Sequence, residues 1–124
     1  MTGTEALAPP FAIALTPSAQ ADLEALRAAA EHARSARAER GVRKSSRQEG
    51  LYRQVAKVVR LLHENPRHPS LQTHEFHSLE HPFDSAAKVF EAYAQNRTPG
   101  AHRVFWCYGP EAGMITILAI TPHP

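Results

Sequence analysis

Glu91 and Tyr93 are the first residues of this chain whose types and spacing suggest chemistry. They alternate with Val89 in a segment of strand composition, so all three side chains should point to one face of a strand. If that face is accessible, Glu91 could act as a general base and Tyr93 could stack on a nucleobase. If it is the core face, Tyr93 is a packed aromatic residue with its hydroxyl at the rim.

Positive charge is concentrated in residues 34–60. This segment holds nine of the fourteen lysine and arginine residues and two of the twelve acidic residues, although the formal net charge of the whole chain is only +2. Dense positive charge on a small domain attracts polyanions, because each neutralised phosphate releases counterions. The segment is a candidate nucleic-acid surface, and the alternative is a solvated helical face followed by a linker.

The eight histidines raise the question of a metal site, and their spacing argues against one. His68, His74, His77 and His81 match no compact zinc motif, and a single cysteine, Cys107, cannot supply a cysteine pair. We therefore expect neither a metal nor a cofactor. Cys107 alternates with residues of a strand and is expected to be buried as a small apolar side chain.

The N-terminal half contains the signals of one strand and two helices. Alternating apolar residues in 11–16 predict a short strand, and Thr16 and Pro17 supply the cap of a helix that should run to about residue 37 or 40. The polar stretch 41–50, bounded by glycines, is expected to be a mobile basic connector. Apolar residues at helical spacing then predict a second helix over about 49–64, forming a hairpin with the first.

The C-terminal half has strand composition. Four segments rich in β-branched and aromatic residues are separated by short turn-rich stretches, which favours an antiparallel meander. They span residues 71–79, 88–95, 102–108 and 114–120. The order predicts an α+β fold, with an N-terminal strand, a two-helix hairpin and a four-stranded antiparallel meander in one twisted sheet. The expected core consists of Ile13, Leu15, Leu23, Leu26, Val55, Val59, Leu62, Val104, Trp106, Ile115 and Ile117.

A length of 124 residues fits one domain, which we expect over residues 11–124 after a disordered leader in residues 1–10. No apolar run approaches the ~18 residues of a membrane-spanning helix, and the N-terminus lacks the parts of a signal peptide. One cysteine favours a reducing compartment. We expect a cytoplasmic protein with no membrane partner.

Three strings of this sequence resemble the RelE/ParE superfamily, the toxins of bacterial type II toxin–antitoxin pairs. GAHRVFW (residues 100–106) and ILAITPHP (residues 117–124) are similar to the arginine-bearing strand and to the last strand with its C-terminal tip. NPRHPSL (residues 65–71) is similar to the junction between helix and strand. The resemblance covers nearly all of residues 11–124 and implies a RelE-like fold.

In the RelE-like branches of that superfamily the toxins are ribosome-dependent endoribonucleases that cleave mRNA without a metal. The resemblance implies that Arg103 stabilises the phosphate and that His123 transfers a proton as acid or base. His74 and Glu75 stand near the place where some branches have a catalytic carboxylate or basic side chain, and the register between them is open. Glu91 is the remaining catalytic candidate, as a base.

The superfamily often has an arginine soon after the matching glutamate, where this chain has Ala92–Gln95. Lys88 or Arg97 could replace that second phosphate-binding cation. The expected RNA-binding residues are Arg43, Lys44, Arg47, Arg53, Lys57, Lys88, Tyr93 and Arg97.

The resemblance also implies partners: a cognate antitoxin, the ribosome and mRNA, with DNA bound only through a complex with the antitoxin. Two alternatives stay open. One is a ParE-like toxin that acts on gyrase by protein contact, and the other is an inactive member that only binds its antitoxin. ParE-like chains generally lack the complete acid–base set, so Arg103 together with His123 favours the nuclease.

Overall fold

The computed structural model describes residues 9–96 and 100–122. Along these ranges the elements are β1 (Ala12–Leu15), α1 (Pro17–Glu39), α2 (Arg47–Glu64), the 3-10 helix η2 (Pro69–Leu71), β2 (His74–Glu75), β3 (Phe90–Tyr93), β4 (His102–Tyr108) and β5 (Met114–Pro122). One strand, two helices and four further strands follow each other in the predicted order, which confirms the α+β fold class. In the described ranges no helix is long and apolar enough to cross a membrane.

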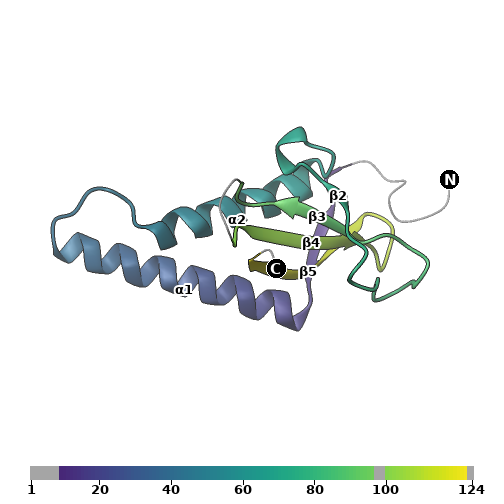
Figure 1. Cartoon of the computed structure of the whole chain (residues 1–124), viewed down its shortest axis with the longest axis horizontal. Coiled ribbons are helices and arrows are strands. Elements are labelled where there is room, and N and C mark those ends of the chain that lie inside the picture. Colours follow the sequence, from purple (N-terminus) through teal and green to yellow (C-terminus); the bar gives the residue numbers. More distant parts are fainter. Residues whose placement is uncertain (1–8, 97–99, 123–124) are drawn as a thin grey trace.

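All five strands form one sheet in the order β1-β5-β4-β3-β2 (Figure 1). The last four strands are antiparallel neighbours, as the predicted meander requires. β1 pairs in parallel with β5, with Ile13 opposite Ile115. This pairing places the first strand of the chain beside the last one, so the two helices and the meander together act as the crossover between them.

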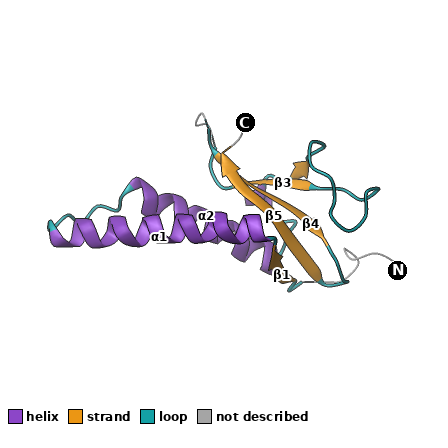
Figure 2. Ribbon diagram, turned by 90° about the horizontal axis from the view of Figure 1, so that it is seen from below, coloured by secondary structure: helices purple, strands orange, loops and turns teal. Residues whose placement is uncertain are grey.

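The two helices cover one face of the sheet, with α1 packed on β5 and α2 on β4 (Figure 2). The helical hairpin is longer than the face that it covers. Its tip, residues 40–46, therefore protrudes beyond the sheet (Figures 1 and 2). The opposite face, which we call the helix-free face, carries none of the helices that the described ranges contain.

Side-chain caps fix where both helices begin. Thr16 Oγ1 accepts a hydrogen bond from the first turn of α1, in agreement with the predicted start. α2 begins at Arg47, earlier than predicted, because Ser46 and Glu49 form a reciprocal capping box. The connector that we expected over 41–50 is accordingly shorter, since its last four residues are helical.

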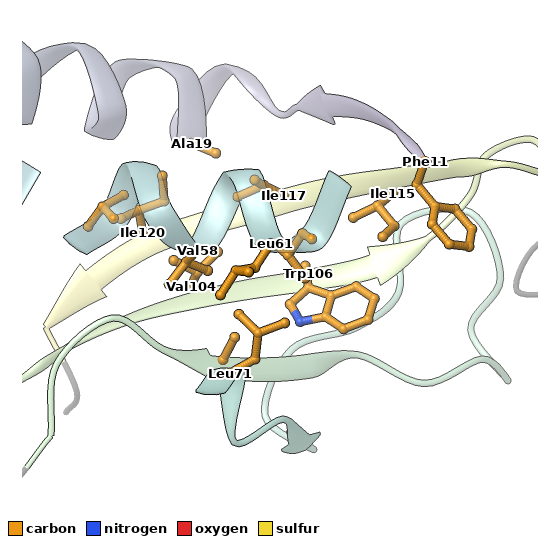
Figure 3. Close-up of a cluster of buried hydrophobic side chains, with 13 residues drawn as sticks. Phe11, Ala19, Val58, Leu61, Leu71, Val104, Trp106, Ile115, Ile117 and Ile120 are labelled. Atoms are coloured by element: carbon orange, nitrogen blue, oxygen red, sulfur yellow. The ribbon is translucent and has the colours of Figure 1, made fainter. Parts of the chain in front are cut away.

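The main core lies between the helices and the sheet. Val58 and Leu61 of α2 lie over Val104 and Trp106 of β4 (Figure 3). All eleven predicted core residues either belong to this buried cluster or pack against it. Each fully buried aliphatic side chain contributes roughly 1.5–3 kcal/mol, so the cluster is the main source of stability.

β4 is buried on the helix-free face as well. Phe105 and Cys107 are almost fully buried there, as is Val89, and the ring of Phe76 lies 4.6 Å from that of Phe105. The segment between β2 and β3 thus packs over this end of the sheet. Cys107 is buried as predicted, and burial raises the pKa of its thiol to about 11.

The first strand of the meander is much shorter than predicted. Instead of a strand over 71–79, the chain forms η2, a left-handed residue and the two-residue strand β2. Pro69 starts the 3-10 turn, and Gln72 ends it with a φ of 49°. The helical turn and the left-handed residue that ends it are not extended backbone, so the strand begins only at His74.

The next strand is also shorter than predicted, since 88–95 contains only the four residues of β3. Its ladder with β4 ends at Tyr93, after which the amides of Ala94 and Gln95 both donate to the carbonyl oxygen of His102. β4 has the predicted bounds. β5 continues past its predicted end to Pro122.

Candidate active site

The strand register gathers four of the predicted site residues on the helix-free face. His74 pairs with Glu91 across β2 and β3, and Tyr93 pairs with Arg103 across β3 and β4. Alternate residues of one strand share a face, so the two pairs lie side by side. The sequence left open whether Glu91 and Tyr93 point to the core face or to the other face. In the structure both point away from the main core. We call these four residues the polar cluster.

A hydrogen-bonded pair forms one half of the polar cluster. His74 Nε2 lies 2.7 Å from Glu91 Oε1, and the side chains are 47% and 2% exposed, so a substrate would reach His74 first. His74 Nδ1 lies 3.2 Å from the carbonyl oxygen of Gln72, which can only accept, so Nδ1 carries a proton. Nε2 and Oε1 are within hydrogen-bonding distance of each other, so the two groups can share one proton. The pair is built to hold and transfer a proton.

Arg103 is held firmly beside this pair. Its Nη1 donates to three carbonyl oxygens, those of Gln95 at 2.8 Å, Ala101 at 3.2 Å and His102 at 3.4 Å. Its Nε lies 3.9 Å from Glu91 Oε1, which is an ion pair beyond hydrogen-bonding distance. Within the described ranges Nε is buried and makes no hydrogen bond, and the Arg103 side chain is 11% exposed, so an oxyanion would meet only the small part of the guanidinium that solvent reaches.

Tyr93 orients both of its basic neighbours. Arg103 Cζ lies 3.9 Å from the centroid of the Tyr93 ring, and the His74 ring meets the same ring edge-on at 5.4 Å. The cation–π contact fixes the plane of the guanidinium. Arg103 thereby occupies one face of the Tyr93 ring.

The polar cluster combines a buried carboxylate, a permanent cation and a half-exposed imidazole. Low exposure strengthens the interactions among these charges. The arrangement can bind an oxyanion through Arg103 and move a proton through the His74–Glu91 pair. Across residues 9–96 and 100–122, no group of three or more His, Cys, Asp or Glu side chains could hold a metal ion.

Two other predicted residues lie away from the polar cluster. It is His74 that contacts Glu91, whereas Glu75 points the opposite way, as alternation along β2 requires. The Glu75 carboxylate lies 3.0 Å from Lys88 Nζ, and this contact is the main cause of its lowered pKa. Lys88 therefore sits in an exposed ion pair at the sheet edge.

His123 and Arg97, the remaining catalytic and RNA-binding candidates of this region, lie outside the described residues. Thr121 of β5 pairs with Arg103 of β4. His123 is the second residue after Thr121 in the sequence.

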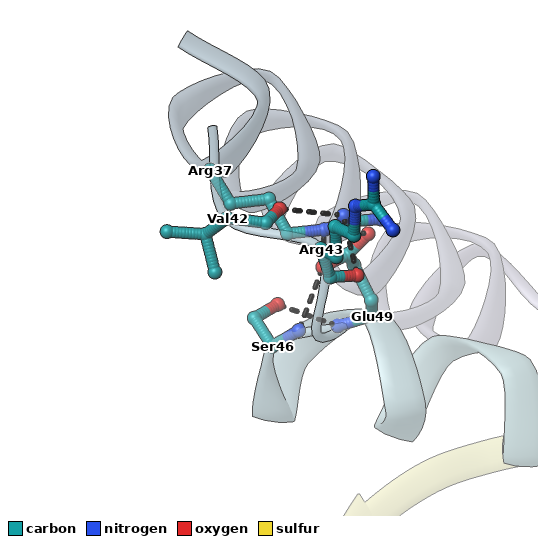
Figure 4. A network of polar contacts seen from close by, with 5 residues as sticks. All are labelled: Arg37, Val42, Arg43, Ser46 and Glu49. Atoms are coloured by element: carbon teal, nitrogen blue, oxygen red, sulfur yellow. Dashed lines mark hydrogen bonds and ion pairs between the residues drawn. The ribbon is translucent and has the colours of Figure 1, made fainter. Parts of the chain in front are cut away.

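Arg37 ties the hairpin tip to the start of α2 (Figure 4). Its Nε lies 2.8 Å and 3.0 Å from the two carboxylate oxygens of Glu49, and its Nη1 donates to the carbonyl oxygens of Val42 and Arg43 at 3.1 Å each. The hydrogen bond from Arg37 is the largest cause that lowers the pKa of Glu49 to about 2. The connector that we expected to be mobile thus has fixed backbone contacts.

The predicted RNA-binding cations of the helical hairpin fall into two exposed groups. The tip cations are Arg43, Lys44 and Arg47. The α2 row is Arg53 and Lys57 together with Arg60, which was not among the predicted residues and which lies 3.1 Å from a carboxylate oxygen of Glu64. α2 is joined to the segment after β3 by a hydrogen bond that the Gln95 side chain donates to Gln54, the residue after Arg53, at 3.3 Å. The carbonyl oxygen of Gln95 in turn accepts from Arg103.

Gln72 and Gln95 are site residues that the sequence did not predict. Both act through backbone carbonyl groups, toward His74 and Arg103 respectively. A backbone acceptor leaves no signal in residue type. The left-handed conformation of Gln72 is also unusual for a residue other than glycine, so no local sequence pattern predicts it.

No protein-family model and no curated protein sequence matches the chain. The architecture described above, a helical hairpin on one face of a sheet with an arginine on a central strand, is a RelE/YoeB-like fold. The solved structure of the YoeB dimer from Staphylococcus aureus is similar, with a TM-score of 0.54 over 93% of this chain and 99% of that chain, at 10% sequence identity. At this identity the similarity establishes the fold, and it confirms the RelE-like fold that the sequence predicted.

Proposed function

We propose that this protein is the toxin of a type II toxin–antitoxin pair and that it cleaves mRNA on the ribosome without a metal. The supporting observation is the position of Arg103 beside the His74–Glu91 pair on a fold similar to that of YoeB. RNA transesterification needs an anion-binding group next to a proton-transferring group. Both are present in the polar cluster.

In the proposed reaction a ribose 2′-hydroxyl of mRNA attacks the adjacent phosphorus. Glu91 takes the hydroxyl proton on its carboxylate as the new O–P bond forms, and His74 orients that carboxylate. Arg103 stabilises the negative charge that builds up on the phosphate. His123 gives a proton to the 5′ oxygen as its bond to phosphorus breaks, so the products are a 2′,3′-cyclic phosphate and a 5′-hydroxyl.

The proposed partners follow from the charge of the helical hairpin. The tip cations and the α2 row bind the phosphates of ribosomal RNA and mRNA without reading sequence. The cognate antitoxin covers or distorts the helix-free face through apolar anchors, and its acidic residues meet residues 34–60. The site of action is the cytoplasm.

The test is inducible expression in bacterial cells, with transcript ends and gyrase-linked DNA breaks mapped in the same cultures. Arg103→Gln should reduce mRNA cleavage by about 10²–10³-fold, the usual cost of one charge-stabilising donor. Circular dichroism checks folding, because Arg103 also binds three backbone carbonyl groups. Arg27→Gln removes an exposed arginine of α1 and should cleave like the wild type.

Undiminished cleavage in a folded Arg103→Gln, His123→Ala double variant would refute the nuclease. Gyrase-linked breaks without mRNA cleavage would support the ParE-like alternative. Antitoxin binding without growth arrest would identify an inactive member.

A further inference from the structure

A second candidate site lies on the opposite side of the sheet from the polar cluster. A cavity of about 490 Å³ opens between the segment around η2 and the strands β3 and β4. Phe90, Trp106 and Tyr108 line it, and these residues alternate with the strand residues that face the polar cluster. Its volume is in the range of small-molecule sites, roughly 300–1,000 Å³.

Three aromatic rings form the floor of this cavity. The Phe90 ring lies 4.8 Å from that of Trp106 and 6.0 Å from that of Tyr108, and Trp106 and Tyr108 are 5.1 Å apart. Phe90 and Tyr108 are half-buried, whereas Trp106 lies deeper and is 1% exposed. A planar ring can stack on one of the two half-buried side chains and meet the other edge-on, because the planes of Phe90 and Tyr108 are 82° apart.

The walls of the cavity offer hydrogen-bond donors. Arg67 brings an exposed guanidinium, and His68 has its proton on Nε2 because its Nδ1 accepts from the Ser70 amide at 3.1 Å. Thr73 Oγ1 and Trp106 Nε1 are buried and make no hydrogen bond to any described residue. Buried polar groups are normally paired, so these two are suited to a ligand that accepts.

The cavity has no acidic side chain among the described residues that line it. We propose that it binds a mononucleotide unit, with the base against Phe90 and Tyr108 and the phosphate at Arg67. A nucleotide combines a planar ring, acceptor atoms and negative charge in one molecule. A free nucleotide and an unpaired nucleotide of RNA share this chemistry. The site stands independently of the nuclease, because it uses the other face of the sheet.

Trp106 is the one tryptophan of the chain, so its fluorescence reports on the cavity directly. Adenosine 5′-monophosphate is titrated into the full-length protein, with excitation beyond the adenine absorption band. The emission should change saturably, and adenosine should bind about tenfold more weakly because it lacks the charged contact with Arg67. A short 5′-phosphorylated RNA that binds tighter than the mononucleotide, with a gain in affinity that Arg67→Gln removes, would identify RNA as the source, and equal affinity would identify the free nucleotide.

Substitutions show whether the change in fluorescence comes from binding in this cavity. Arg67→Gln should abolish the difference between the nucleotide and adenosine, and Thr73→Val should weaken both, while Arg34→Gln on α1 changes neither. Arg103→Gln should keep nucleotide binding, which separates this site from the nuclease. A missing response to nucleotides, or a response that Arg67→Gln and Thr73→Val leave unchanged, would overturn the proposal. Saturation by an acidic peptide alone would assign the cavity to a protein partner instead.

Discussion

Glu91 is the residue on which the proposed chemistry depends most closely, since its 2%-exposed carboxylate lies between an imidazole and a guanidinium. Glu91→Gln keeps the shape of the side chain and removes its ability to carry the transferable proton. We expect the fold to persist and cleavage to fall by about 10²–10⁴-fold, the usual contribution of general acid–base catalysis. The measurement is the rate of mRNA cleavage by purified protein on ribosomes.

Glu75→Gln is the matched control for that experiment. It removes the same charge one strand position from His74, where the carboxylate contacts Lys88 at the exposed sheet edge. Its cleavage rate should stay within a few-fold of the wild type. Equal losses in both variants would mean that net charge, and not the proton on the His74–Glu91 pair, limits the reaction.

Cys107 gives a residue-scale test of the packing on the helix-free face, where Phe76 lies against Phe105. The thiolate is the reactive form of cysteine, and burial raises the pKa of this thiol to about 11. Native protein at pH 8 should therefore react with an alkylating reagent about 10²-fold more slowly than unfolded protein. Mass spectrometry with and without denaturant measures the two rates. Rapid labelling of the native protein would contradict the packing of the segment between β2 and β3 over β4.

At the scale of the elements, Arg37 of α1 holds the hairpin tip in place by binding Glu49 of α2 and the tip backbone. Arg37→Gln removes the contacts with Glu49 and with two carbonyl groups of the tip. Backbone amides of residues 42–46 should then exchange hydrogen about tenfold faster, because local opening becomes easier. Arg27→Gln, which breaks exposed ion pairs within α1, should leave the exchange of the tip unchanged.

The link between Arg37 and Glu49 also predicts a pH dependence. A carboxyl group whose pKa is lower in the folded state stabilises that state above its unfolded pKa and loses this contribution as pH falls toward the folded value. Glu49 moves from 4.5 to about 2, so the tip contacts should hold from neutral pH to about 4.5 and weaken between 4.5 and 2. Carboxyl chemical shifts measured by NMR follow this titration. An unshifted Glu49 in the wild type would show that the tip is open.

Much of this element-scale picture was predictable from local pattern. Thr16 marks the start of α1, and strand alternation places Glu91 and Tyr93 on one face. Other parts depend on contacts between distant residues. The parallel pairing of β1 with β5 joins the two ends of the described chain, and the left-handed Gln72 shortens β2. Neither has a signature in residue type or spacing, so the sequence could not predict them.

At the scale of the whole molecule, the helical hairpin carries two groups of cations that lie at different distances from the polar cluster. Gln54, the residue after Arg53 of the α2 row, contacts Gln95, whose carbonyl oxygen accepts a hydrogen bond from Arg103 of the polar cluster. The tip cations are farther away, since a helix rises 1.5 Å per residue and Arg47 and Arg60 are therefore about 20 Å apart along α2. A short RNA in the polar cluster should reach the α2 row and should not reach the tip.

Two triple variants test this arrangement with the same loss of charge. Replacing Arg53, Lys57 and Arg60 by glutamine should weaken binding of a short single-stranded RNA, whereas replacing Arg43, Lys44 and Arg47 should weaken only binding to ribosomes. Each lost phosphate contact lowers the salt dependence of single-strand binding by about 0.7 in logarithmic slope, so the α2 variant should lose about 2. Affinities for both ligands are measured over a range of salt concentrations. Equal losses for the short RNA would mean that the hairpin attracts RNA as one undivided positive surface, because position along α2 would then make no difference.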